Sequence, residues 1–95
     1  MTTFEVSGQV KRFPGQHGWY YVELNAERSA DLRPMVAGVW PALLRAGFSL
    51  RTTTWQSSIM PIKNGPLFIA LPAKVRTAEK IEEGQTVTIQ VELKI

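Results

Sequence analysis

The sequence contains no cysteine and only one histidine, His17. Disulfide scaffolds and cysteine nucleophiles need thiols, and the usual zinc sites need thiolates or several imidazoles, so these classes are excluded. No apolar run reaches the roughly 20 residues of a membrane-spanning helix, and residues 1–8 lack the basic and apolar segments of a secretory signal. We therefore expect a cytoplasmic protein with no membrane segment and no cofactor.

The chain also lacks a strong charge of either sign. Its net charge of +3 comes from 11 lysines and arginines that are spread among 8 carboxylates. This balance permits nucleic-acid binding, but an ordinary mixed and solvated surface is the favoured interpretation. A length of 95 residues corresponds to one domain, residues 1–95, which can bury a core without disulfides or a metal.

The second half of the chain shows a clear order of elements. Proline, asparagine and glycine gather in residues 61–66, between two β-branched and aromatic runs, which predicts a hairpin. Pro72 suits the first position of a short helix that continues through Glu79, and Ile81 and Gly84 are expected to end this helix. Residues 86–95 then alternate between apolar and polar side chains, which is the period of a half-buried strand.

The first half gives a similar but weaker pattern. Asn25 is a good helix cap, Pro34 is expected to stop the helix, and Pro41 indicates an edge strand or a bulge. The predicted elements are a strand from Phe4, a turn at 13–18, a strand at 19–24, a helix at 26–32, a strand at 39–46 and a strand at 48–60.

A shift of 47 residues aligns the two halves without a gap, for example Pro14 with Pro61 and Leu24 with Leu71. We therefore predict an internal duplication, with half-repeats at about 4–48 and 51–95. Alternation along the strands predicts one shared core of inward-facing residues: Tyr20, Val22, Leu24, Leu67, Ile69, Leu71, Val87, Ile89 and Val91.

Three segments carry a family resemblance: GWYYVEL at 18–24, WQSSIMPIKNG at 55–65 and LPAKVRTAEKIEEGQTV at 71–87. They resemble the bacterial "domain of unknown function 1905" family, in which a tryptophan precedes a Thr/Ser-Ser-Leu-x-Pro run, followed by Leu-Pro-x-x-Val-Arg and Ile-x-x-Gly-Asp. Two departures from this pattern are Gln85, where the family has aspartate, and Arg51-Thr52, where a glycine pair is common.

The resemblance implies a mainly β fold with two short helices, namely a six-stranded double-split β-barrel. This architecture is shared with transcription factors and antitoxins of the AbrB and MazE kind, which build the barrel from two chains. An internal duplication would let one chain build it.

No reactive constellation points to an enzyme. His17 has no carboxylate, serine or second histidine at a useful spacing, and Ser57 and Ser58 have no accompanying base. Glu82 and Glu83 are expected to be solvated at a helix end. We expect a non-enzymatic binding or interaction module, and the alternative is an AbrB-like nucleic-acid-binding regulator.

Two groups of residues are candidate contacts. For the nucleic-acid alternative, phosphates would contact the basic residues Lys11, Arg12, Lys63, Lys74 and Arg76. The simpler interpretation of Arg76 is a surface ion pair with Glu79, three residues later on the helix.

The second group is aromatic. Strand phase turns Trp19, Tyr21 and Phe68 away from the core, whereas Trp40 and Trp55 are expected inside it. A large outward-facing ring needs a cover, which would be a protein partner, a second copy of the chain, or a neighbouring loop such as residues 34–38.

Overall fold

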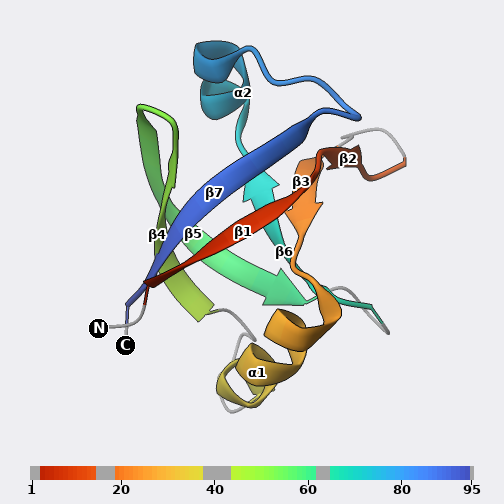
Figure 1. Ribbon diagram of the computed structural model, residues 1–95, viewed down its shortest axis with the longest axis vertical. Coiled ribbons are helices and arrows are strands. Elements are labelled where there is room, and N and C mark those ends of the chain that lie inside the picture. Colours follow the sequence, from red (N-terminus) through yellow and green to blue (C-terminus); the bar gives the residue numbers. More distant parts are fainter. Residues whose placement is uncertain (1–2, 15–18, 38–43, 62–64, 95) are drawn as a thin grey trace.

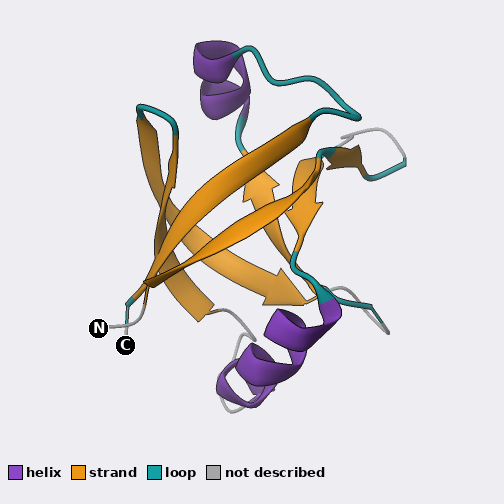
Figure 2. Cartoon of the chain, in the orientation of Figure 1, coloured by secondary structure: helices purple, strands orange, loops and turns teal. Residues whose placement is uncertain are grey.

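The computed structural model describes residues 3–14, 19–37, 44–61 and 65–94 (Figure 1). Antiparallel strands are the main secondary structure of the described residues, and the two helices lie at opposite ends of the curled sheet (Figure 2). In chain order the elements are β1 (Thr3–Gln9), β2 (Lys11–Arg12), β3 (Tyr20–Glu23), α1 (Ala26–Ala37), β4 (Leu44–Leu50), β5 (Thr53–Pro61), β6 (Leu67–Leu71), α2 (Ala73–Glu79) and β7 (Thr86–Leu93). The mainly β class with two helices is therefore confirmed.

The strands form one sheet in the order β1-β7-β4-β5-β6-β3-β2, and every pair is antiparallel. The two outermost strands, β1 and β2, are separated in the chain by Val10 alone. The amide of Val10 donates to the Gln85 carbonyl at 2.8 Å, and its carbonyl accepts from the Gly84 amide at 2.8 Å. One bent segment therefore forms both edges, and the sheet curls around its core. The number of barrel strands and the double-split arrangement stay predictions.

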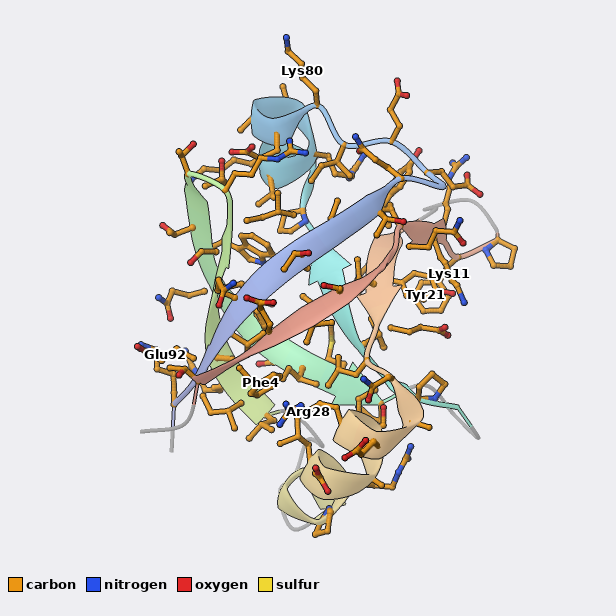
Figure 3. The ribbon with its side chains drawn as sticks, in the orientation of Figure 1. Phe4, Lys11, Tyr21, Arg28, Lys80 and Glu92 are labelled. Carbon is orange, nitrogen blue, oxygen red and sulfur yellow. The ribbon has the colours of Figure 1, made fainter. Side chains whose placement is uncertain are left out.

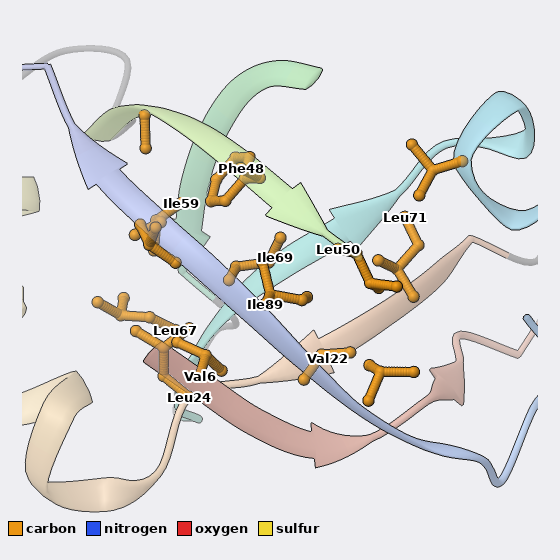
Figure 4. Packing of buried hydrophobic residues seen from close by; sticks show 14 of the residues in the cluster. Val6, Val22, Leu24, Phe48, Leu50, Ile59, Leu67, Ile69, Leu71 and Ile89 are labelled. Carbon is orange, nitrogen blue, oxygen red and sulfur yellow. The ribbon is translucent and has the colours of Figure 1, made fainter. Parts of the chain in front are cut away.

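The core fills the inside of the curled sheet (Figure 4). Alternate residues of the strands point inward, as period-two patterning requires. Eight of the nine predicted core residues are buried: Val22, Leu24, Leu67, Ile69, Leu71, Val87, Ile89 and Val91. The ninth, Tyr20, is only half-buried because it lies where the sheet meets α2. Trp55 packs half-buried against this core, and Trp40 lies outside the described residues.

The prediction that Pro34 ends the first helix is wrong, because α1 continues to Ala37. A proline at this position removes the hydrogen bond to the Ala30 carbonyl. Both Pro34 and Ala30 are exposed, so water can replace the lost donor. The Asn25 cap is confirmed, since its side-chain oxygen accepts from the Arg28 amide at 2.7 Å.

The predicted boundary between the strands at 39–46 and 48–60 is wrong, whereas residues 39–43, with Pro41, lie outside the described residues. The structure has β4 and β5 as a hairpin in which Leu50 lies opposite Thr53, so Arg51 and Thr52 form a two-residue turn. Arg51 adopts a φ of 56°, a conformation that glycine or asparagine usually supplies. Since neither Arg51 nor Thr52 is a typical turn former, the sequence did not indicate a turn between the two strands.

Helix α2 begins and ends as its local sequence permits. Pro72 is the N-cap rather than the first helical residue, with a φ of −62° and a ψ of 154°. At the other end Lys80 is left-handed with a φ of 53°, and the Ile81 amide donates to the Arg76 carbonyl at 2.9 Å. This is a Schellman ending, and it stops the helix before Gly84. Gly84 itself has a φ of 91° in the loop before β7, which agrees with its predicted left-handed conformation.

Two strand pairs match the 47-residue shift. Val22 lies opposite Ile69 and Ala46 lies opposite Leu93, and both pairs are separated by that shift. The outer strands do not match the shift. Phe4 pairs with Val91, so a duplication with the same register would pair Arg51 with Leu44. Leu44 instead lies opposite Ile59, and Arg51 is in the turn. The duplication and the superposition of its halves stay predictions.

Candidate functional site

The outward-facing aromatic residues do not form one exposed surface. Tyr21 is 9% exposed and Phe68 is 6% exposed. Both pack against Phe13, which stacks on Tyr21 with ring centroids 4.0 Å apart and meets Phe68 edge-on at 5.3 Å. Phe13 lies in the loop after β2, so a neighbouring loop covers these rings. The side chains of residues 35–38 in the predicted cover lie outside the described part of the chain. Both rings lie outside the main core cluster, as the outward phase predicts, but Tyr21 and Phe68 are too buried to form an accessible contact surface.

Trp19 behaves differently from the other two rings. It is 54% exposed, and no other large apolar side chain among the described residues is exposed. It lines a pocket of about 310 Å³ between the start of β3 and the start of α2. The lining residues are Trp19, Tyr20, Ala70, Leu71, Pro72, Ala73 and Arg76.

Strand register builds one wall of this pocket. Tyr20 in β3 lies opposite Leu71 in β6 on one side and opposite Arg12 in β2 on the other. Directly opposed residues share one face of a sheet, so these three side chains form a row across three strands. The chain then turns at Pro72 into α2, which brings Arg76 back over the row. The pocket is therefore a product of the β3–β6 pairing and the short β6–α2 connection.

The guanidinium group of Arg76 is held in place from two sides. Its Nε donates to the Leu71 carbonyl at 3.1 Å, and its central carbon lies 4.1 Å from the centre of the Tyr20 ring. The guanidinium carbon of Arg12 lies 5.6 Å from the same ring. A planar cation stacked on an aromatic face keeps its outer N–H groups directed sideways, where they can bind an oxyanion.

The predicted ion pair between Arg76 and Glu79 is absent, because Glu79 has other partners. Its carboxylate accepts hydrogen bonds from the Thr53 and Thr52 hydroxyls and lies 3.6 Å from Nη1 of Arg51. The Thr53 hydrogen bond is the largest cause that lowers the pKa of Glu79, with smaller contributions from Thr52 and Arg51. Within the described part of the chain, Arg76 therefore has no carboxylate partner.

The other basic candidates do not gather at the pocket. Lys11 donates to Glu23 at 2.6 Å, and this hydrogen bond raises the pKa of the Lys11 ammonium (Figure 3). Lys74 is exposed on α2, and Lys63 lies outside the described residues. Of the five predicted phosphate contacts, the structure brings only Arg12 and Arg76 together.

The residues considered for catalysis remain scattered. Ser57 and Ser58 are half-buried in β5, and Glu82 and Glu83 are exposed in the loop before β7. His17 lies outside the described residues. The described residues contain no group of three side chains able to hold a metal ion. Among them, neither α1 nor α2 has the length and apolar character to cross a bilayer.

Comparison with family models identifies the chain. The model of the family described as "Domain of unknown function (DUF1905)" matches residues 7–91, which is nearly the whole sequence. This chain belongs to the DUF1905 family. The match includes every residue that lines the Trp19 pocket, so the pocket lies within the DUF1905 domain. The comparison with curated proteins gave no match.

Sequence reasoning identified several residues in this DUF1905 pocket or beside it, as Arg12 is, without placing them together. Trp19 was predicted as a contact residue, and Arg12 and Arg76 were predicted as phosphate contacts, in separate groups. Tyr20 was assigned to the core, although it forms the floor on which both arginines stack. The missing step was the register of β2, β3 and β6, which determines that Arg12, Tyr20 and Leu71 lie in one row.

Proposed function

We propose that this DUF1905 domain is a non-enzymatic binding module whose ligand combines a flat apolar group with a negative charge. One observation carries the proposal: the exposed Trp19 shares a pocket with the Arg76 guanidinium, and no carboxylate of the described residues lines that pocket. The indole would stack on the flat group, and the arginine would bind the anion.

Several features of the pocket support this assignment. A volume of about 310 Å³ falls at the lower end of small-ligand sites. Leu71, Pro72 and Ala73 supply an apolar wall, and the Leu71 carbonyl and Tyr20 ring orient Arg76 in advance. An arginine that is already oriented loses less rotamer entropy when it binds an oxyanion.

The chemistry of the lining favours binding over catalysis. Among the described residues, the lining holds no carboxylate, histidine, lysine, serine or threonine, which are the side chains that most often act as general acid, general base or nucleophile. A partner protein or a second copy of the chain remains the alternative occupant, with its contact at Trp19.

We also propose that the curled sheet is a double-split barrel of the AbrB and MazE kind, built by one chain through duplication. The pairs Val22–Ile69 and Ala46–Leu93 support this arrangement, since both lie where a twofold axis would pass between equivalent strands. The different registers of the β1–β7 and β4–β5 pairs would then reflect divergence of the two halves.

Titration with naphthyl phosphate in a calorimeter tests the binding function, because this compound joins a flat ring to an oxyanion. We expect saturable binding that Arg76→Gln weakens roughly 10- to 150-fold, the range of one charge-assisted hydrogen bond. Gln at this position keeps a donor for the Leu71 carbonyl. Uncharged naphthol and inorganic phosphate should each bind more weakly than the joined compound.

Arg45→Ala is the matched control, since Arg45 is exposed on β4 and does not line the pocket. It removes the same charge and should leave the affinity unchanged. Equal losses in both variants, or no binding by the wild-type domain, would exclude the pocket as the binding site.

A further inference from the structure

We infer that the natural occupant of the Trp19 pocket is a nucleotide unit of single-stranded nucleic acid, bound without sequence preference. The inference rests on the proposed binding function and names the class of ligand. In this arrangement an unpaired base stacks on Trp19, and the backbone phosphates contact Arg76 and Arg12.

The exposed indole is the first argument. A ring that is 54% exposed beside a pocket offers a flat face, and every nucleobase has a matching face. In a duplex those faces are already stacked on neighbouring base pairs, so only an unpaired base can use Trp19. The geometry therefore favours a single strand over a duplex.

The two arginines are the second argument. Arg12 and Arg76 stack on the same Tyr20 ring, and neither has a carboxylate partner among the described residues. Two guanidinium groups around one ring provide charge for a repeated anion rather than for a single carboxylate. The phosphates of a nucleic-acid backbone are such a repeated anion.

Strand pairing argues against an extended peptide. Tyr20 and Tyr21 already pair with β2 on one side and with β6 on the other, so β3 offers no open edge beside the pocket. A peptide that adds a strand needs such an edge for its main-chain hydrogen bonds. Recognition at this place must therefore use side-chain faces and charge.

The lining also indicates how specific the recognition is. Among the described residues it contains no Asn, Gln, Asp, Glu, Ser or Thr, which read base edges through hydrogen bonds, and its one arginine, Arg76, is assigned to the phosphate. Stacking and charge alone do not distinguish one base from another. We therefore expect similar affinities for different homopolymers.

Fluorescence anisotropy with a labelled oligothymidylate of about 12 nucleotides tests the inference. At about 50 mM salt and micromolar protein we expect binding that weakens with salt, with a log-log slope of about −1.4 for two phosphate contacts on a single strand. Trp19→Ala should weaken binding roughly 5- to 150-fold, and Trp19→Phe should restore most of it because a flat ring returns. Arg12→Ala and Arg76→Gln should each reduce the slope by about 0.7, and Arg45→Ala should leave it unchanged.

Two comparisons separate stacking from general charge attraction. The same oligonucleotide with abasic residues keeps its phosphates but has no bases to stack on Trp19. Its affinity for the wild-type domain should fall as much as the affinity of the intact oligonucleotide falls in Trp19→Ala. A duplex of the same length should bind more weakly than the single strand. Equal or tighter duplex binding, or unchanged binding by Trp19→Ala while its melting temperature is preserved, would overturn the inference.

Failure of this inference can be distinguished from failure of the binding function. If naphthyl phosphate binds through Arg76 but no oligonucleotide binds, the pocket is a binding site and the nucleic-acid assignment is wrong. If neither probe binds, both proposals are wrong. A phosphotyrosine peptide that displaces the oligonucleotide and binds more tightly would assign the pocket to a protein partner instead.

Discussion

The Glu79 side chain joins the end of α2 to the turn between β4 and β5. Its carboxylate is contacted by Thr52, Thr53 and Arg51, and its side chain is only 9% exposed. A carboxylate at the C-terminal end of a helix is unfavourable with respect to the helix dipole, so its partners in the turn must offset that repulsion. These contacts also hold Arg51 and Thr52 in a turn that their residue types do not favour.

Replacement of Glu79 with Gln should lower the free energy of unfolding at neutral pH. The folded-state pKa of Glu79 lies below its ordinary value of 4.5, so the charged carboxylate stabilises the folded protein above that pH. This stabilisation is lost as the pH falls through the folded-state pKa. Urea unfolding at a series of pH values should therefore show the wild type and the variant converging in acid.

The control for this experiment is Glu83→Gln, at an exposed residue in the loop before β7. It should run parallel to the wild type over the whole pH range. An acid profile for Glu79→Gln that equals the wild-type profile would show that another carboxylate controls the acid response.

At the scale of elements, Lys80 has a conformation that suits a different residue. It is exposed and left-handed with a φ of 53°, and its backbone closes the Schellman ending of α2. Lys80→Gly should raise the free energy of unfolding by about 0.5–1 kcal/mol, because glycine adopts this conformation without a Cβ penalty. Thermal unfolding followed by circular dichroism measures the change.

Gly84→Ala is the opposite control, since Gly84 has a φ of 91° and its Cβ would meet open space. Backbone strain alone should then destabilise the domain. If Lys80→Gly also destabilises the domain, contacts of the Lys80 side chain stabilise the folded state by more than its left-handed backbone destabilises it.

Sequence patterns predicted the strands and helices best where local chemistry and tertiary packing agree. Strand β7 and helix α2 combine clear alternation, a proline start and a glycine in the following loop, and the structure confirms them. The β4–β5 turn could not be predicted, because Arg51 and Thr52 form it only with the help of Glu79 from a distant helix. The Trp19 pocket could not be predicted either, since it depends on strand register and on the return of α2 over β3.

For the whole molecule, stability depends on the core inside the curled sheet. Ile89 is fully buried in β7, which pairs with both β1 and β4. Ile89→Ala should cost roughly 2–5 kcal/mol, a large part of the stability of a domain this size. Guanidinium denaturation measures the loss, and Thr86→Ala, at an exposed residue of the same strand, should change stability by less than about 0.5 kcal/mol. Equal effects of the two substitutions would contradict this assignment of the core.

The pairing of β1 with β7 also determines when the domain can fold during synthesis. Phe4 lies opposite Val91, so β1 leaves the ribosome long before β7, its neighbour in the described sheet, is made. The β4–β5 hairpin can form earlier, because it needs only local chain closure. The entropy of closing the long loop between β1 and β7 is lost only at the last step. The nascent chain is therefore expected to carry β1 without its partner until β7 has left the ribosome, and an unpaired strand is open to chaperones and to pairing with other chains.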